Sequence, residues 1–473
     1  MNQGPITAFV GGTIIDGTGR APIYRGVVLV QGKRIAAVGD ATLSIPAEAH
    51  RVSAEGHYII PGLLDANVHL VLDYWPLTLI RYEARYDELA IEAAQVTLKN
   101  GVTTVFDTWG PLDFLRKARA AVETGETIGS RIFLAGNIVG LGGPFSPDFL
   151  QSDHLLQEFP TRVNALWEQG VGADLVWKSP AQVRTAIRHY LSRGIDFLKF
   201  AVTTHCGDQR HIVFSPRVQA AIVEEARAAG KTVQTHSTTN EGLHLALEAN
   251  VDLVQHADLT FGPEPLPDET IELLAARRTA AAILPQTQSA LEWYRAHSDR
   301  TPWLKRYEVM DRNVRNLLQG GANLLLSTDG GLFSSNTLNS SSWESWQPPT
   351  ESLLTLGEGH FHWLLAMQQK GMSPMQALQA ATQNIARAYG VEQQIGTLEP
   401  GKLADLVILE KNPLEHASNY RSIIAVIKEG ERIDRDALPT RRLLTAETQT
   451  SPEQGSAAPK ILTRPCSLAS GRS

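Results

Sequence analysis

The sequence predicts an α/β protein, namely a (β/α)8 (TIM) barrel with a small composite β-sandwich domain formed from both chain ends. Three observations lead to this prediction. The middle of the chain alternates short apolar runs with longer helical patterns. Both ends carry short β-type segments separated by glycines. The length of 473 residues exceeds what one compact domain usually holds.

The two ends of the chain share the same β-rich texture. The β-type segments are 8–10, 26–30 and 34–38 near the start, and 396–398, 404–409 and 423–427 near the end. Glycine turns such as Gly12 and Gly32 separate the first group. We therefore expect residues 1–60 and 395–435 to form one composite domain.

The middle, residues 61–394, should form the barrel. Helical stretches such as 88–99 and 217–229 follow buried apolar strands. The eight candidate strands are 62–70, 103–108, 132–136, 197–202, 232–237, 253–257, 281–286 and 324–329. Eight such units predict a closed barrel, with the active site at the carboxyl ends of the strands.

Two segments interrupt this rhythm. Residues 331–357 are rich in Ser, Trp and Pro and are too long for an ordinary connection, so we expect a lid or pocket wall there. Residues 445–473 are rich in Ser, Thr, Ala and Pro, which predicts a flexible tail.

Composition indicates which partners to expect. With 43% apolar and 20% charged residues and a net charge of -7, the chain has the composition of a globular protein that does not bind nucleic acid. Only Cys206 and Cys466 occur, too few for a disulfide framework. The start lacks a signal-peptide pattern, and no stretch has the roughly 18 apolar residues of a spanning helix. We expect a cytoplasmic protein without a membrane partner.

Polar side chains stand at or near the carboxyl ends of five of the eight strands. They are Asn67, His69, Lys199, His236, His256 and Asp329. Asn67 and His69 are two positions apart, so they share a face of their strand. Histidines, a carboxylate and a buried lysine that converge at one opening are typical of a divalent metal site. We expect one or two Zn²⁺ ions per chain, with Co²⁺ or Mn²⁺ as alternatives.

Each of these residues also has a simpler explanation. A single strand histidine is more often a hydrogen-bonded core residue than a metal ligand. Lys199 could reach solvent or pair with a carboxylate, and Asn67 could bond to backbone. Asp329 could cap the turn that begins at Gly330. Their joint placement favours the metal site, because chance seldom brings so many such residues to strand ends.

Lys199 needs a separate argument. An ammonium group beside a dication would be repelled, and burial lowers the pKa of a lysine. The neutral amine of Lys199 could take up carbon dioxide and become a carbamate, an anionic ligand able to bridge two metal ions.

Several motifs of the chain are similar to those of one enzyme family. Residues 61–69 read Pro-Gly-Leu-Leu-Asp-Ala-Asn-Val-His, residues 101–105 read Gly-Val-Thr-Thr-Val, and residues 327–329 read Ser-Thr-Asp. With the closing segment 396–406, these resemble the amidohydrolase superfamily, in particular its imidazolonepropionase-like and prolidase-like members. The resemblance covers about residues 6–430. It matches Lys199 to the bridging lysine and His236 and His256 to the later histidines.

Asn67 departs from the pattern, because the family usually has His at this position. An amide oxygen is a neutral and weaker zinc ligand, so the first metal position should bind loosely or stay empty. The Asn-x-His variant resembles a branch that contains phenylurea hydrolase and molinate hydrolase. Residues 141–144, Leu-Gly-Gly-Pro, also replace the family's usual Gly-Gly-His. The chain therefore lacks the histidine of that motif.

The resemblance implies a metal-dependent hydrolase that cleaves a C–N bond of a urea- or amide-like small molecule, and a homo-oligomer. An N-aryl urea that releases an aniline is the favoured substrate. The alternatives are a thiocarbamate, an X-Pro or N-acyl amino-acid substrate, and a non-catalytic scaffold. A substrate with a carboxylate would call for a cation in the pocket, for which Arg210 is a weak candidate.

Roles in the reaction follow as hypotheses. Water activated at the metal would attack the carbonyl carbon. Asp329 would take the proton from this water and pass it to the leaving nitrogen. His256 is a second candidate catalytic residue, and His205 could donate to the carbonyl oxygen. An aromatic pocket for a phenyl group is expected, whose candidate lining residues are Tyr74, Trp75, Trp109 and His205. Packing or a surface position is the alternative for each of them.

Overall fold

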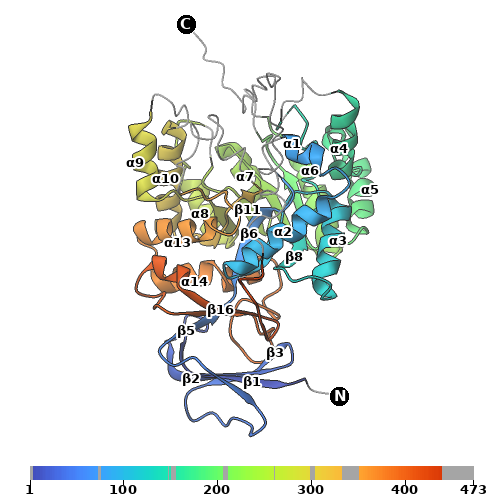
Figure 1. Ribbon diagram of the computed structural model, residues 1–473. Helices are drawn as coiled ribbons and strands as arrows, with labels where there is room; N and C mark the ends of the chain where they lie inside the picture. Colours follow the sequence, from blue (N-terminus) through green and yellow to red (C-terminus); the bar gives the residue numbers. More distant parts are fainter. Residues whose placement is uncertain are drawn as a thin grey trace, which may run out of the picture.

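Strands from the two ends of the chain meet in one sheet at one end of the molecule, blue and red in the computed structural model of Figure 1. The structure describes residues 4–72, 76–147, 149–150, 156–205, 211–259, 262–298, 304–332 and 351–438. The predicted tail 445–473 and most of the segment 331–357 lie outside these ranges.

This sheet has the order β17-β16-β15-β5-β1-β2-β3, and β4 pairs with β1. Antiparallel pairing of β15 with β5, at Leu406 opposite Pro61, joins the two ends of the chain. Apolar residues such as Ile14, Val28 and Ile427 form its core. The strands are β1 (Ile6–Ile14), β2 (Ile23–Gln31), β3 (Arg34–Gly39), β4 (His50–Ser53), β5 (Tyr58–Pro61), β15 (Leu406–Leu409), β16 (Ile423–Lys428) and β17 (Glu431–Arg432).

One predicted strand of this region was wrong. Residues 396–398 are not a strand, although the Leu398 amide donates to the Asp16 carbonyl at 2.9 Å. Gly396 has a φ of +95°, which is incompatible with an extended strand. All eight strands are hydrogen-bonded into one continuous sheet, so the sandwich arrangement stays a prediction.

All eight predicted central strands are present and lie in two sheets, β14-β6-β7-β8 and β13-β12-β11-β10-β9, whose neighbouring strands are parallel. Each ends one to three residues before its predicted end. The strands are β6 (Leu63–His69), β7 (Val102–Asp107), β8 (Arg131–Leu134), β9 (Leu198–Ala201), β10 (Val233–His236), β11 (Leu253–Gln255), β12 (Ala280–Ile283), β13 (Asn323–Leu326) and β14 (Gly330–Gly331).

Helices alternate with these strands and surround them in Figure 1. In α3, Leu112, Leu115, Ala118 and Val122 are buried at the spacing of one helical face. The helices are α1 (Pro76–Arg81), α2 (Tyr86–Lys99), α3 (Leu112–Glu123), α4 (Glu158–Glu168), η1 (Ala173–Trp177), α5 (Pro180–Leu191), α6 (Pro216–Ala228), α7 (Asn240–Glu248), α8 (Asp268–Arg277), α9 (Gln288–Ala296), α10 (Leu304–Gln319), α13 (Gly359–Gln369), α14 (Pro374–Ala380), α15 (Gln383–Ala388) and η2 (Ala417–Arg421).

Backbone hydrogen bonds also cross between the two parallel sheets. The Val139 amide, past the end of β8, donates to the Lys199 carbonyl of β9 at 2.9 Å. At the other junction, the Asp329 amide donates to the Asn67 carbonyl of β6 at 2.9 Å. These bonds tie Lys199 of β9 to the segment that follows β8, and Asp329, three residues after β13, to Asn67 of β6.

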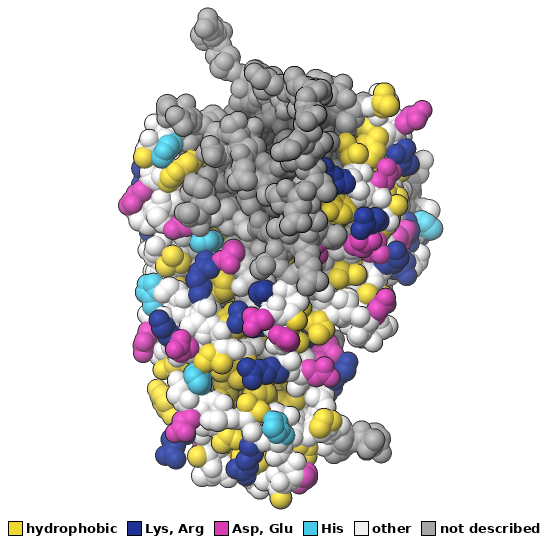
Figure 2. Space-filling view, viewed as in Figure 1, with side chains coloured by type: hydrophobic (Ala, Val, Ile, Leu, Met, Phe, Trp, Pro, Cys, Tyr) yellow, Lys and Arg dark blue, Asp and Glu magenta, His cyan; other side chains and the backbone are white. Residues whose placement is uncertain are grey.

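On the face shown in Figure 2, basic and acidic side chains are interspersed over the described surface. Within the described part of the chain, no helix combines the length and the apolar character needed to cross a membrane.

Candidate active site

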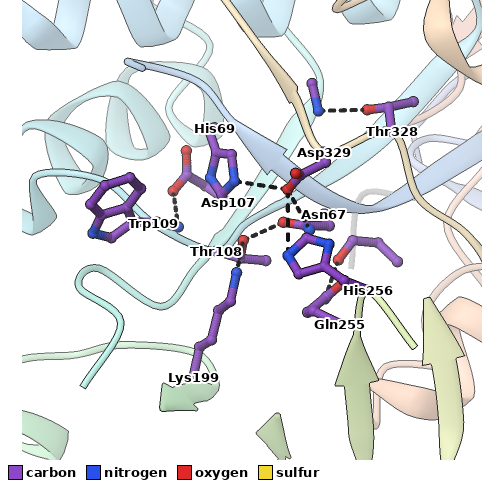
Figure 3. A network of polar contacts seen from close by, with 12 residues as sticks. Asn67, His69, Asp107, Thr108, Trp109, Lys199, Gln255, His256, Thr328 and Asp329 are labelled. Carbon is purple, nitrogen blue, oxygen red and sulfur yellow. Dashed lines mark hydrogen bonds and ion pairs between the residues drawn. The ribbon is translucent and has the colours of Figure 1, made fainter. Parts of the chain in front are cut away.

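The carboxylate of Asp329 contacts three other predicted site residues (Figure 3). Asn67 Nδ2 donates to Asp329 Oδ1 at 2.8 Å, and His69 Nε2 lies 3.0 Å from the same oxygen. His256 Nε2 is 3.9 Å away. Residues from β6, from the end of β11 and from the segment after β13 therefore converge on one oxygen atom.

Lys199 joins this group through a hydroxyl that the sequence analysis missed. Its Nζ donates to Thr108 Oγ1 at 3.0 Å, and Thr108 Oγ1 in turn donates to Asn67 Oδ1. Thr108 directly follows β7, so its place at a strand end was the signal that could have identified it. Thr108 links the lysine to the amide that holds Asp329.

His236, the last residue of β10, lies beside two other histidines. Its ring centroid is 5.0 Å from that of His256 and 4.5 Å from that of His205. Both ring nitrogens of His236 are buried and have no hydrogen-bond partner among the described residues. The structure thus gathers all six predicted metal-binding residues, and His205, in one region.

The backbone explains why two of these side chains leave their strands. His256 and Asp329 have φ values of +57° and +52°, a left-handed conformation that cannot continue a strand. Asp65 stabilises the turn at Asp329, because its carboxylate accepts hydrogen bonds from the backbone amides of Asn67 and Thr328 at 3.2 and 3.1 Å. The Gly330 amide donates to Thr328 Oγ1, so Thr328 rather than Asp329 caps this turn.

Burial sets the charges of the site. Burial lowers the pKa of His256 to about 3 and the pKa of His236 well below its usual value. Burial also lowers the pKa of Lys199 to about 8, although the negative charge of Asp329 opposes this shift. Burial would raise the pKa of Asp329, but His256, His69 and Lys199 outweigh it and hold that pKa well below its usual range. Asp329 is therefore ionised at neutral pH, and the imidazoles are neutral, as metal ligands must be.

The donor set suits a divalent metal ion. His69 Nδ1, His256 Nδ1 and both nitrogens of His236 are buried without a hydrogen bond from the described residues. Leaving a buried polar atom without a partner costs about 1–3 kcal/mol, and a metal bond would remove that penalty. Within the described ranges, no three His, Cys, Asp or Glu side chains are close enough to hold an ion by themselves. The fit therefore rests on the chemistry and burial of the donors.

Aromatic rings border the site on one side. The ring centroid of Trp109 lies 4.9 Å from those of His205 and Phe149, and 6.2 Å from that of His69. Phe149 was not predicted, because it lies in a long connection with no regular pattern. Tyr74 and Trp75, predicted to contact substrate, and Arg210 lie outside the described residues.

Comparison with known proteins gives consistent matches over most of the chain. The model of the Amidohydrolase family matches residues 58–433. Ochratoxinase from Aspergillus niger is 23% identical, over 90% of this chain and 85% of its own length. Imidazolonepropionase from Symbiobacterium thermophilum is 25% identical, over 89% of this chain and 93% of its own length.

Two solved structures are more similar. Molinate hydrolase has a TM-score of 0.88 and 37% identity, covering 97% of this chain and all (100%) of its own. Phenylurea hydrolase B has a TM-score of 0.88 and 38% identity, covering 93% of this chain and 99% of its own.

Proposed function

The chain belongs to the amidohydrolase family, and we propose that it is a metal-dependent hydrolase that cleaves a C–N bond of an N-aryl urea to release an aniline. The predicted resemblance to this family, and to phenylurea and molinate hydrolases, is confirmed. The convergence of Asn67, His69 and His256 on Asp329 carries the proposal. A thiocarbamate is the second candidate substrate, supported by the 37% identity to molinate hydrolase.

The family generally binds divalent metals, and we propose Zn²⁺ here, with Co²⁺ or Mn²⁺ as alternatives. The residues that would hold it are His69, Lys199, His236, His256 and Asp329, with Asn67 as a weak contributor. When bound, the ion would supply a Lewis acid for the carbonyl oxygen and lower the pKa of a water molecule. Lys199 could join as a carbamate, because its lowered pKa leaves part of it as the neutral amine that reacts with carbon dioxide.

Asp329 is suited to move the proton. Its side chain is 19% exposed, against 8% for His69 and 4% for His256, so among these three it is the one that water reaches most easily. As an ionised carboxylate, Asp329 would accept a proton from the attacking water and return it to the leaving nitrogen. His205, 4.5 Å from His236 between ring centroids, would donate to the carbonyl oxygen.

The wider architecture is part of the proposal. The bonds from Val139 to Lys199 and from Asp329 to Asn67 support closure of the eight parallel strands into one barrel over residues 61–394. Residues 1–60 and 395–435 would form the accessory β domain. We also propose a cytoplasmic homo-oligomer that acts on a small molecule.

Metal analysis of the purified protein, combined with hydrolysis assays, tests this function. We expect about one or two divalent ions per chain and aniline release from an aryl urea that stops after chelation and returns with Zn²⁺. Faster hydrolysis of a thiocarbamate or an acyl-proline dipeptide would transfer the assignment to that substrate. A protein without stoichiometric metal and without hydrolysis would contradict the proposal and indicate a scaffold.

A further inference from the structure

We propose that Asn137 is a positioning residue, which fixes the indole of Trp109 and thereby shapes the aromatic side of the site that selects an aryl substituent. The inference rests on the proposed function, because it takes the substrate to bind beside Trp109. Asn137 lies three residues after the end of β8 and is fully buried.

The side chain of Asn137 is held in a single orientation. Its Oδ1 accepts from Trp109 Nε1 at 2.9 Å, and its Nδ2 donates to the Leu141 carbonyl at 2.9 Å. An indole N–H can only donate and a carbonyl can only accept, so the reversed amide would satisfy neither partner. The Asn137 amide is used twice, and both bonds depend on its orientation.

The backbone around Asn137 is fixed as well. Tyr190 Oη accepts from the backbone N–H of Asn137 at 2.7 Å and donates to the backbone carbonyl of Ala135 at 2.9 Å. Gly136, between them, has a φ of +73°, and a Cβ there would overlap the Tyr190 hydroxyl. The Gly110 amide donates to the Gly136 carbonyl at 2.9 Å, so the segments after β7 and β8 are joined by backbone and side chain together.

Trp109 transmits this restraint to the site. Its side chain is buried, and its ring meets His69 edge to face at 87° and contacts Phe149 and His205. Figure 3 shows Trp109 beside His69 and Asp107. An indole that lost its acceptor would leave a buried N–H unpaired, and turning it towards another acceptor would displace the rings packed against it.

Substitutions at both ends of the hydrogen bond test the proposal. Asn137→Ala and Trp109→Phe should each lower the ratio of kcat/KM for an aryl urea over an alkyl urea by about fivefold, as expected for one buried hydrogen bond. The double variant should lower this ratio no further, because both changes remove the same hydrogen bond.

Ser130→Ala is the matched control. Ser130 is also buried and bonded to the Val102 carbonyl, but it precedes β8 at the opposite end of that strand. Ser130→Ala should reduce stability and keep the ratio.

The outcomes separate the two proposals. A wild-type ratio in Asn137→Ala, with aryl-urea hydrolysis intact, would overturn the role of Asn137 and leave the proposed function standing. A wild-type protein that hydrolyses no urea would contradict the proposed function. The positioning role is then decided by exchange of the Trp109 indole proton in NMR spectra, assigned with Trp109→Phe. Asn137→Ala should accelerate that exchange at least about tenfold, and unchanged exchange would overturn the proposal.

Discussion

Asn67 donates its side-chain amide to Asp329 Oδ1 at 2.8 Å, across 262 positions of sequence. Its amide oxygen meanwhile accepts from Thr108, so both ends of the amide are engaged. The residue that the family usually fills with a metal-binding histidine thus acts here as a hydrogen-bond donor that orients the predicted general base.

Asn67→His should raise the metal content of the chain. An imidazole is a stronger zinc ligand than an amide oxygen, and the substitution restores the family's usual pattern. We expect more Zn²⁺ per chain by elemental analysis, together with slower turnover, because Asp329 loses the amide donor. Unchanged metal content in a folded variant would show that this position lies outside the metal site.

Thr108→Val should reduce turnover about tenfold, because the isosteric side chain removes the hydroxyl between Lys199 and Asn67. Thr108→Ser keeps the hydroxyl and should retain most of the activity. Steady-state kinetics with metal analysis provides the measurement. Equal activity of the valine and serine variants would rule out the linking role of Thr108.

Asp329→Asn should lower turnover at least about 100-fold, because an amide cannot take up the proton of the attacking water. Circular dichroism and the midpoint of thermal unfolding should remain close to those of the wild type. Asp113→Asn, at an exposed carboxylate of α3, is the control and should keep full activity. Near-normal turnover in Asp329→Asn would remove this residue from the mechanism.

His360 should make the protein less stable in mild acid. Burial lowers its folded-state pKa to about 3 from the usual 6.5, against the opposing hydrogen bond to the Asn100 carbonyl. As the pH falls from 6.5 towards 3, the unfolded chain takes up a proton that the folded protein does not, so stability is lost across this window. One pKa unit corresponds to 1.36 kcal/mol, so His360 should lower the free energy of unfolding by about 2 kcal/mol between pH 7 and pH 5. Replacement of His360 by glutamine should remove this part of the loss.

Urea unfolding at the two pH values measures this effect. The same replacement at His189, which is exposed on α5, should leave the wild-type loss of stability unchanged. A loss in His360→Gln as large as that of the wild type would show that other groups cause the acid sensitivity.

Arg131 should stabilise the contact between β8 and the sheet at the chain ends. Its guanidinium binds Asp405 at 2.6 Å and Glu429 at 2.9 Å, and the side chains of Arg131 and Asp405 are only 11% and 5% exposed. Arg131→Leu leaves the Asp405 charge buried without its cation and should cost about 3 kcal/mol in urea unfolding. The double variant Arg131→Leu, Asp405→Asn should lose less than the sum of the single changes, whereas an additive loss would contradict the coupling.

The sequence by itself determined which residues lie at the strand ends. Alternation of apolar runs and helical patterns identified all eight parallel strands, and this placed His69 and His236 at strand ends as predicted, whereas Asp329 lies three residues after the end of β13. The physical reason is local, because a parallel strand that is buried on both faces is mostly apolar and is bounded by turn residues. Four short strands among the described residues were not predicted. The residues of β4 and β17 are mostly exposed, and β5 and β14 have only four and two residues, too few to carry a clear pattern.

Only the tertiary structure decided how these side chains bond to one another. Thr108 meets Asn67 across 41 positions and Lys199 across 91, and Asn137 meets Trp109 across 28. Such contacts depend on the order in which strands pair and on the turns after them, including the left-handed residues His256 and Asp329. Neither property follows from local periodicity, because the side-chain pattern of a strand is the same whichever strand lies beside it.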